Sequence, residues 1–516
     1  MLMKSKRGIV CCGALLMTAL LFGSPSTIWA VEGGKEQNKA AVKMTLADAV
    51  IIALNNNVSL KSAYLDRILQ QFDLRKAENK FFPEQSVKLT AGRTSNYSSP
   101  DERTNAVNTG GDYTATLTIP TGGNFNFTWN NAGNSPDTNQ AFAYTSAWSL
   151  TFTQPLLRGG GIDNATYSVK VARITEEQNI LSMRDTISST IKTAITAYRT
   201  YLSANRQLEI SRQSLLEAKR TYETNEALIT AGRKARTELV ETEANVANQE
   251  LAATTAQNSL ESARLSLVQA INVEKNTLFE LVEENDYQVK PPSLPEAIGI
   301  AKKNRTDYLK ALQNMEIKKW DLSNAKWNRM WSLDLVAGTT DSESTTALDK
   351  YGDSLRRATS SGAQRNWTAG LTLTVPFSLL TPERRAYISA QNELEKAKMN
   401  LQKMEVDLEI AVQSAVRDVE TNYRQMGLAK RARSLSEQKL EVENEKLKVG
   451  RTTNFQIVSY QNDLNNAKTS ELNAVIAYHN SLTSLDETLG TTLATWKIEV
   501  KKEDDKVKLP QAAVKP

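Results

Sequence analysis

Few side chains in this 516-residue sequence have the type and spacing that chemistry requires. The chain contains a single histidine, His479, which argues against most metallohydrolases, catalytic triads and histidine-based acid–base catalysis. His479 follows the apolar residues 474–478 and is interpreted as a packing or surface residue. The run Gly159-Gly160-Gly161 lacks the Lys and Ser or Thr that follow in a phosphate-binding loop. The sequence therefore offers no catalytic constellation, and we expect no enzyme activity, no cofactor and no metal site.

The first thirty residues differ in composition from the rest. Three basic residues within the first seven precede an apolar run at 9–22, and small residues follow up to Ala30. This pattern indicates a secretory signal peptide over residues 1–30; an uncleaved anchor helix is the alternative, which the short apolar run disfavours. Both cysteines, Cys11 and Cys12, lie in this segment, so the mature chain would have neither a disulfide nor thiol chemistry.

The mature chain would be nearly neutral. Without the three signal-peptide cations, 60 of the 63 basic residues remain against 58 acidic residues. This balance gives no electrostatic argument for nucleic-acid binding, and we expect no nucleic-acid partner. No later segment approaches the roughly twenty apolar residues of a membrane-spanning helix. If the secreted protein crosses a membrane, it must therefore do so as a β-barrel.

The most informative feature is an internal duplication. The stretch that begins at Thr45 matches the one that begins at Ser293, without a gap, through the identical pairs Leu46/Leu294, Ala49/Ala297, Ala53/Ala301, Asn56/Asn304, Ala63/Ala311, Asp73/Asp321, Leu74/Leu322 and Ala77/Ala325. Further matches follow in the same order: 87–92 with 333–338, 150–155 with 371–376, and 231–233 with 449–451. This conserved order argues against chance.

Each half predicts the same succession of helix, strands, very long helix, sharp turn and helix. The predicted helices are 46–82, 165–231 and 236–272 in the first half, and 297–330, 383–449 and 455–489 in the second. The longest would each measure about 100 Å, and the two shorter helices of each half could stack end to end beside it. Apolar residues recur at three- and four-residue steps, which predicts a coiled-coil seam at Ile187, Ile191, Ala194, Ile195, Tyr198, Tyr201 and Leu202.

Between the first two helices of each half the apolar period changes to two. Strands are predicted at 85–93 and within 113–154 in the first half, and at 332–338 and 367–375 in the second. Each is apolar on one face and rich in Thr and Ser on the other, as in a barrel with lipid outside and water inside. A soluble antiparallel sheet alternates in the same way, so the signal peptide and the long helices decide for the barrel. The polar stretches 94–112, 131–143 and 339–366 are expected to be surface loops.

Together these residues resemble the TolC-type outer-membrane efflux proteins, from about residue 44 to residue 490. The most specific parts are the duplication, the passage from a strand through Gln154-Pro155 toward a long helix, and the Val-Gly-Arg-Thr turn at 449–452. The stretch 154–161 also resembles the strand–helix junction of one branch of that family, and Pro155 and Pro376 mark the two junctions.

The resemblance implies a mainly α fold with a membrane β-barrel portion. Internally duplicated, long antiparallel coiled-coil helices would form an α-helical tunnel continuous with a trimeric β-barrel. The protein would be a homotrimer in the outer membrane of a Gram-negative-type cell, in contact with outer-membrane lipid and extending into the periplasm. It would serve as the passive, gated exit channel of a tripartite efflux pump or a type I secretion system, exporting small molecules or proteins. Its other partners would be a periplasmic adaptor (membrane fusion) protein and an inner-membrane pump.

The resemblance also implies two sets of site residues. The helical turns would form the periplasmic tip that meets the adaptor, with Gly232, Arg233, Gly450, Arg451 and Thr452 as contact residues; an ordinary hairpin turn without a partner is the alternative. Just beyond the turns, acidic residues often form the constriction in related channels. The constriction candidates here are Glu238 and Glu241, with Gln456 and Ser459 at the corresponding second-half positions. Rings of carboxylates would attract cations, although solvated glutamates on a helix face would have the same sequence.

One departure concerns residues 113–129, where a turn at 120–123 predicts an extra hairpin that either widens the barrel or lies outside it. The predicted organisation is a signal peptide (1–30), a flexible segment (31–43), a first repeat (44–290) with a helical hairpin at 165–272, a second repeat (291–490) with a hairpin at 383–489, and a carboxy-terminal tail (491–516). A periplasmic coiled-coil adaptor or tether is the alternative function. Adaptors typically have one helical hairpin in a β-rich body, whereas this sequence predicts two hairpins.

Overall fold

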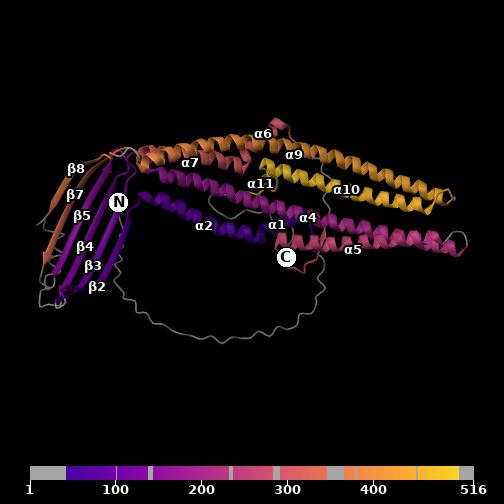
Figure 1. Cartoon of the computed structure of the whole chain (residues 1–516), viewed down its shortest axis with the longest axis horizontal. Helices are drawn as coiled ribbons and strands as arrows, with labels where there is room; N and C mark the ends of the chain where they lie inside the picture. Colours follow the sequence, from indigo (N-terminus) through magenta and orange to yellow (C-terminus); the bar gives the residue numbers. More distant parts are fainter. Residues whose placement is uncertain are drawn as a thin grey trace, which may run out of the picture.

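The computed structural model has a β-sheet at one end and a long body of nearly parallel helices extending away from it (Figure 1). We call the far end of this body, where α4 turns into α5 and α9 into α10, the tip. None of the described helices is long and apolar enough to cross a membrane. The structure describes residues 42–99, 102–136, 143–231, 236–282, 291–345, 365–377, 381–448 and 451–498.

Two very long helices, α4 (Tyr167–Thr230) and α9 (Pro382–Lys448), run the length of the body. Shorter helices lie beside α4: α2 (Val58–Glu78), α1 (Leu46–Asn56) and α5 (Thr237–Ile271). The corresponding helices beside α9 are α7 (Thr306–Asn328), α6 (Leu294–Asn304) and α10 (Asn454–Leu489). The predicted end-to-end stacking of short helices beside a long one is therefore seen in both halves.

The first helix of each half is interrupted, where the sequence predicted continuous helices at 46–82 and 297–330. Asn57 leaves helical geometry at φ −60° and ψ 123°, and its side chain accepts a hydrogen bond from the Leu60 N–H to start α2. Arg305, the corresponding residue of the second half, has nearly the same angles, φ −69° and ψ 118°. Both breaks separate segments whose apolar faces continue, so hydrophobic periodicity alone does not reveal them.

In the part of the chain that the structure describes, the sheet contains six antiparallel strands in the order β2-β3-β4-β5-β7-β8. The first half contributes β2 (Glu84–Ser99), β3 (Glu102–Thr118), β4 (Asn124–Pro136) and β5 (Ala143–Pro155). The second half contributes β7 (Ser332–Thr345) and β8 (Asn366–Thr374). The predicted extra hairpin is thus β3 and β4, and it lies inside the sheet between β2 and β5.

The strands are longer than the sequence predicted. The prediction of loops at 94–112, 131–143 and 339–366 is wrong where β2, β3, β4 and β7 extend into these stretches. Backbone hydrogen bonds continue the antiparallel ladder beyond the apolar part of each strand, and such a ladder tolerates Asn, Ser and Thr on faces in water. A prediction that follows apolar alternation ends too early for this reason.

Two segments predicted to be unstructured are ordered in part. Of the flexible segment 31–43, residues 42 and 43 belong to β1 (Val42–Met44), which pairs in parallel with β6 (Phe279–Leu281). Of the tail 491–516, residues 492–495 form α11 (Thr492–Thr495) and Ile498 is buried in the largest hydrophobic cluster. Backbone pairing orders residues 42 and 43, and burial of the Ile498 side chain holds the end of the second segment. Composition alone predicts neither. The signal peptide, residues 31–41 and residues 499–516 lie outside the described residues.

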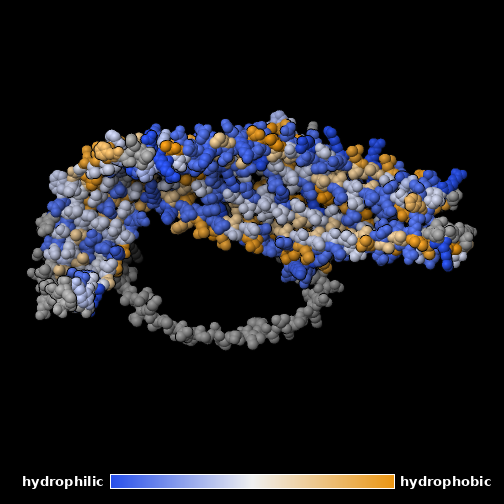
Figure 2. Space-filling view, in the orientation of Figure 1, coloured by the Kyte–Doolittle hydropathy of each residue, from blue (hydrophilic) through white to orange (hydrophobic). Residues whose placement is uncertain are grey.

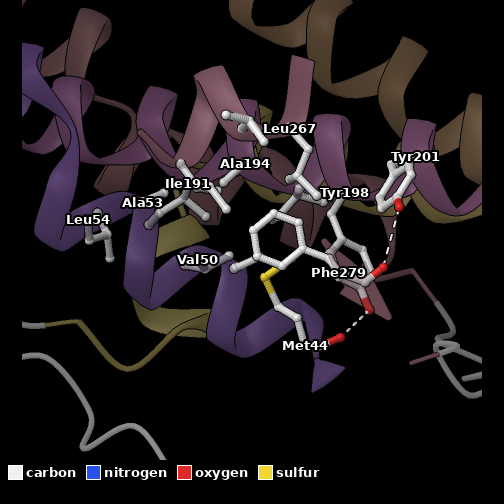
Figure 3. Close-up of a cluster of buried hydrophobic side chains, with 14 of the residues drawn as sticks. Met44, Val50, Ala53, Leu54, Ile191, Ala194, Tyr198, Tyr201, Leu267 and Phe279 are labelled. Carbon is white, nitrogen blue, oxygen red and sulfur yellow. Dashed lines mark hydrogen bonds between the residues drawn. The ribbon is translucent and has the colours of Figure 1, made fainter. Parts of the chain in front are cut away.

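The largest core lies at the middle of α4, where α1, α5 and β6 meet it (Figure 3). All seven residues of the predicted seam are buried, which confirms it. The Tyr198 hydroxyl lies 3.1 Å from the Met44 carbonyl oxygen and 2.6 Å from the Val282 carbonyl oxygen. A buried phenol with a hydrogen-bond acceptor adds apolar area without leaving a polar group unsatisfied. These contacts hold the carboxy-terminal ends of β1 and β6 against α4.

Across the body the helices follow one lateral order. Near the sheet this order is α2, α4, α7, α9, and near the tip it is α5, α4, α10, α9 (Figure 1). One long margin is therefore formed by α2 and α5 and continues into β2. The opposite margin is formed by α9 and continues into β8.

Candidate functional site

The first tip turn connects α4 and α5. Gly232 and Arg233 lie outside the described residues, as does the side chain of Glu238 in the first turn of α5. Glu241, one turn farther along α5, is described and partly exposed. The structure thus places Glu241 close to the tip, and the carboxylate ring stays a prediction.

The second tip turn connects α9 and α10, and Gly450 lies outside the described residues. Arg451 is exposed, and its backbone N–H donates to the Lys446 carbonyl oxygen at 2.9 Å, which closes the carboxy-terminal end of α9. Thr453 caps α10 by accepting a hydrogen bond from the Gln456 N–H at 3.4 Å. Both ends of this turn are therefore fixed by local hydrogen bonds.

A carboxylate on α9 reaches across the same turn. The Thr452 hydroxyl donates to Glu443 Oε1, and the Lys446 ammonium lies 2.9 Å from Glu443 Oε2. The hydrogen bond from Thr452 and the adjacent Lys446 charge lower the pKa of Glu443 below its ordinary value of 4.5. Thr452, predicted as an adaptor contact, is thus also tied to the end of α9.

Hydrogen bonds between side-chain amides join the two helical hairpins near the tip. The Asn454 side-chain N–H donates to Asn225 Oδ1 on α4 at 2.7 Å, and both side chains are buried. In a second, more exposed pair, the Gln249 side-chain N–H on α5 donates to Asn462 Oδ1 on α10 at 3.2 Å. Sequence analysis missed both pairs, because asparagine and glutamine near the end of a long helix give no signal that distinguishes a buried pair from solvated side chains.

The second-half constriction candidates lie on the first two turns of α10. Gln456 and Ser459 are both partly exposed. Because α10 contacts α5, they and Glu241 come from neighbouring helices at the same end of the body. This placement is compatible with a shared constriction.

The strand–helix junctions lie at the opposite end of the body. Pro155 is the last residue of β5, but the ladder continues past it, since the Leu156 N–H donates to the Leu333 carbonyl oxygen at 2.8 Å. Pro376 follows β8 and is exposed. Arg158 and Glu383 lie 3.2 Å apart and join the junction of the first half to the start of α9 in the second.

The glycine run of the first junction receives the turn between β3 and β4. The Gly161 N–H donates to the Thr121 carbonyl oxygen at 3.0 Å, and the Thr121 hydroxyl donates to Gln154 Oε1 at 2.8 Å. A Cβ atom on Gly122 would lie 2.5 Å from the Gly159 carbonyl oxygen. Gly122 also has φ +93°, a backbone conformation that residues other than glycine rarely adopt. The run therefore serves close backbone packing.

Within the described part of the chain, no group of three His, Cys, Asp or Glu residues is arranged to hold a metal ion. The single histidine, His479, is buried and lies against the Tyr478 ring at a centroid distance of 5.7 Å.

Comparison with known proteins identifies the architecture. Residues 50–273 match the family model described as outer membrane efflux protein. The crystal structure of CusC matches with a TM-score of 0.66 and 13% identity, over 88% of this chain and 95% of CusC. The first half of the chain thus resembles the outer-membrane efflux protein family, and the chain as a whole shares the fold of CusC.

Two further solved structures share the fold of this chain. The Campylobacter jejuni outer membrane channel CmeC matches with a TM-score of 0.64 and 15% identity, over 92% of this chain and 94% of CmeC. The open state of the Neisseria gonorrhoeae channel MtrE matches with a TM-score of 0.62 and 16% identity, over 87% and 89% respectively. No curated protein matches by sequence.

These matches confirm the predicted fold class, and they agree with the predicted family and the predicted outer-membrane location. They support an outer-membrane efflux duct as the function, and the family and fold are those of passive channels. Within the described residues, the chain differs from an even duplication in one respect: the first half contributes four strands to the sheet and the second half two.

Proposed function

We propose that this chain is one third of the passive exit duct of a tripartite efflux pump or type I secretion system. The observation that carries the proposal is the pair of open margins, each running from the sheet to the tip. A single copy leaves both margins exposed, and a ring of copies would cover them. The number of copies, three, is the one that the TolC-type resemblance implies.

The first margin is apolar along α2. Leu65, Ile68, Leu69 and Phe72 follow helical spacing and are each more than 60% exposed. Figure 2 shows hydrophobic side chains along this lower edge of the body. Such a stripe on a helix that already packs on α4 is typical of a face that a further helix covers.

The opposite margin is apolar along α9. Val406 and Ile410, and the heptad-spaced Leu428, Leu435 and Val442, are each more than half exposed. A stripe with this period favours packing against another long helix. Because the two margins differ, they would join head to tail, and such contacts close into a ring when the rotation between copies permits.

The sheet supports the same arrangement. Strands β2 and β8 are the two end strands of the sheet in the part of the chain that the structure describes, so each presents an edge with no strand beside it there. Unpaired edges are costly in lipid, and pairing β8 of one copy with β2 of the next would remove both. The occupant of each margin is therefore a second copy of this chain rather than an unrelated protein.

The tip would then provide docking and gating. Arg451 and Thr452, with Gly232, Arg233 and Gly450, would meet the periplasmic adaptor, and the helices would untwist to widen the constriction around Glu238, Glu241, Gln456 and Ser459. The inner-membrane pump would supply the energy. The adaptor alternative receives no support from the comparisons, which are with channels.

Ion selectivity tests the duct and its constriction together. We expect the purified protein to form cation-selective pores in planar bilayers, and Glu238→Gln/Glu241→Gln to lower the cation preference several-fold because a carboxylate ring attracts cations. Gln456→Glu should raise it, and Glu243→Gln, an exposed change on the same helix, should leave it unaltered. Absence of any pore would contradict the duct, whereas pores with unchanged selectivity would contradict only the acidic constriction.

A further inference from the structure

The hairpin β3–β4 has no counterpart among the described residues of the second half, and it adds two strands to the middle of the sheet. We propose that this hairpin is part of the membrane-embedded wall, so that three copies close a barrel of eighteen strands instead of the twelve that four strands per copy would give. The inference rests on the proposed trimer. Its consequence is a wider outer-membrane pore for bulkier cargo.

The first argument is the register of the hairpin. Val87 on β2 lies opposite Tyr113 on β3, Tyr113 opposite Trp129 on β4, and Trp129 opposite Trp148 on β5. These side chains therefore share one face of the sheet. A row of aromatic residues at one level is typical of the boundary of the lipid-facing band in membrane barrels.

The apolar face continues below this row. Phe127 lies opposite Leu150, and Phe125 opposite Phe152, with the two phenylalanine rings stacked at a centroid distance of 4.5 Å. The hairpin thus extends the apolar surface of β5 without interruption. A loop outside the membrane would not require this match.

The opposite face is polar through the same strands. Thr128 and Ser149 lie opposite each other, with their hydroxyl oxygens 2.6 Å apart. The Thr116 hydroxyl lies 3.4 Å from Asn126 Oδ1 on the next strand. Hydroxyl and amide groups on this face match an interior filled with water.

The turn of the hairpin is held at the helix end of the sheet. Thr121 is hydrogen-bonded to Gln154 and to the Gly161 N–H, and Gly122 packs against the Gly159 backbone. Since Gln154 and Gly159 lie where β5 leads into α4, the hairpin is anchored to the same junction that carries the helical body. This anchoring keeps the hairpin in the plane of the wall.

The insertion changes the circumference and leaves the helices as they are. Two antiparallel strands can be added between β2 and β5 without reversing either. Barrel diameter grows roughly linearly with strand number, so eighteen strands give a pore about 1.5 times as wide as twelve. Cargo size would then be limited at the tip and not in the outer membrane.

Site-directed thiol labelling tests whether the hairpin lies in the wall, because both native cysteines are at positions 11 and 12 and the rest of the chain has none. We compare Thr128→Cys with Phe127→Cys, neighbours on opposite faces of β4, in outer membranes treated with a charged, membrane-impermeant maleimide. We expect Thr128→Cys to react at least about tenfold faster, since a charged reagent enters water and not lipid. Equal reaction of both positions in trimers would overturn the inference. Loss of the trimer itself, measured by mass, would instead contradict the proposed function.

A deletion tests the width. Joining Gly92 to Ala143 through Asn-Gly removes the hairpin and, in the present register, places Val87 opposite Trp148. With Ser149→Cys as the reporter, we expect the full chain to admit larger polyethylene-glycol maleimides from outside than the deletion variant does. Equal size limits in two trimeric proteins would overturn the inference. If the deletion variant does not assemble, the cross-section of the full-length trimer by electron microscopy decides between eighteen and twelve strands.

Discussion

At the scale of single residues, the best-defined contact of the tip is the one between Glu443 and Thr452. The two residues are separated by the turn from α9 to α10, so their bond closes that turn. The Lys446 ammonium neutralises the same carboxylate. A site at which an adaptor would dock is thus held by a group that acid can titrate.

Acid should therefore loosen this turn. The pKa of Glu443 is lowered from 4.5 in the folded chain, so its contribution to stability is present above about pH 4.5 and is lost as the pH falls through the lowered pKa. At pH 7 we expect the backbone amides of 451–453 to exchange about tenfold faster in Glu443→Gln than in the unaltered protein, the effect of one hydrogen bond to a charged group. Hydrogen exchange measured from pH 7 down to pH 3 checks this, with the exposed Glu441→Gln as control. Equal exchange of these amides in the two proteins at pH 7 would contradict the assignment.

Sequence reasoning found the position of this turn but not the bond. Gly450 and Arg451 marked a helix end because glycine commonly follows one. Glu443 is one of many glutamates on α9, and its role depends on how the chain returns after the turn. Short-range signals therefore predict where the turn lies, and partners across it require the fold.

At the scale of elements, the contacts between α4 and α10 change along their length. In the middle of the body, the buried Arg199 guanidinium donates to the His479 carbonyl oxygen at 2.8 Å and to Thr483 Oγ1 at 2.7 Å. Near the tip, α4 and α10 are instead joined by the hydrogen bond between the neutral side chains of Asn225 and Asn454. Neutral hydrogen bonds are weaker than charged ones, so the hairpins are held less strongly at the end that would open.

Removing one amide should weaken this contact selectively. Asn454→Ala removes the buried hydrogen bond that Asn225 Oδ1 accepts, and we expect the local opening free energy of the first turns of α10 to fall by about 1–3 kcal/mol. Gln249→Ala removes the more exposed hydrogen bond to Asn462 and should lower the same opening free energy by less than about 1 kcal/mol. Hydrogen exchange of α10 at neutral pH measures both. Equal effects of the two changes would show that the buried Asn225–Asn454 hydrogen bond contributes no more to the opening free energy than the exposed one.

The elements themselves were predictable to different degrees. The seam on α4 follows from apolar spacing and is buried as predicted. The breaks at Asn57 and Arg305 were not found, because one capping residue interrupts the backbone while the apolar face continues. Side-chain patterns predict loops at the polar ends of β2, β3 and β7, because these ends are stabilised by backbone pairing, which such patterns do not record.

At the scale of the whole molecule, the duplicated halves form one continuous layer of helices and one continuous sheet. The sequence predicts that the two halves are alike, since identical residues recur in the same order. It does not predict the two open margins, because these depend on which helix lies beside which (Figure 1). These margins are the reason for regarding the chain as part of a larger assembly.

The molar mass of the mature protein, extracted from outer membranes in detergent and measured by light scattering, tests that assembly most directly. We expect three times the mass of one mature chain, and a reduced mass for a variant with Leu428→Lys, Leu435→Lys and Val442→Lys on α9, since three charges would oppose burial of that margin. The control is Glu441→Gln, an exposed change on the same helix. A monomer released from the periplasm without detergent would contradict the account.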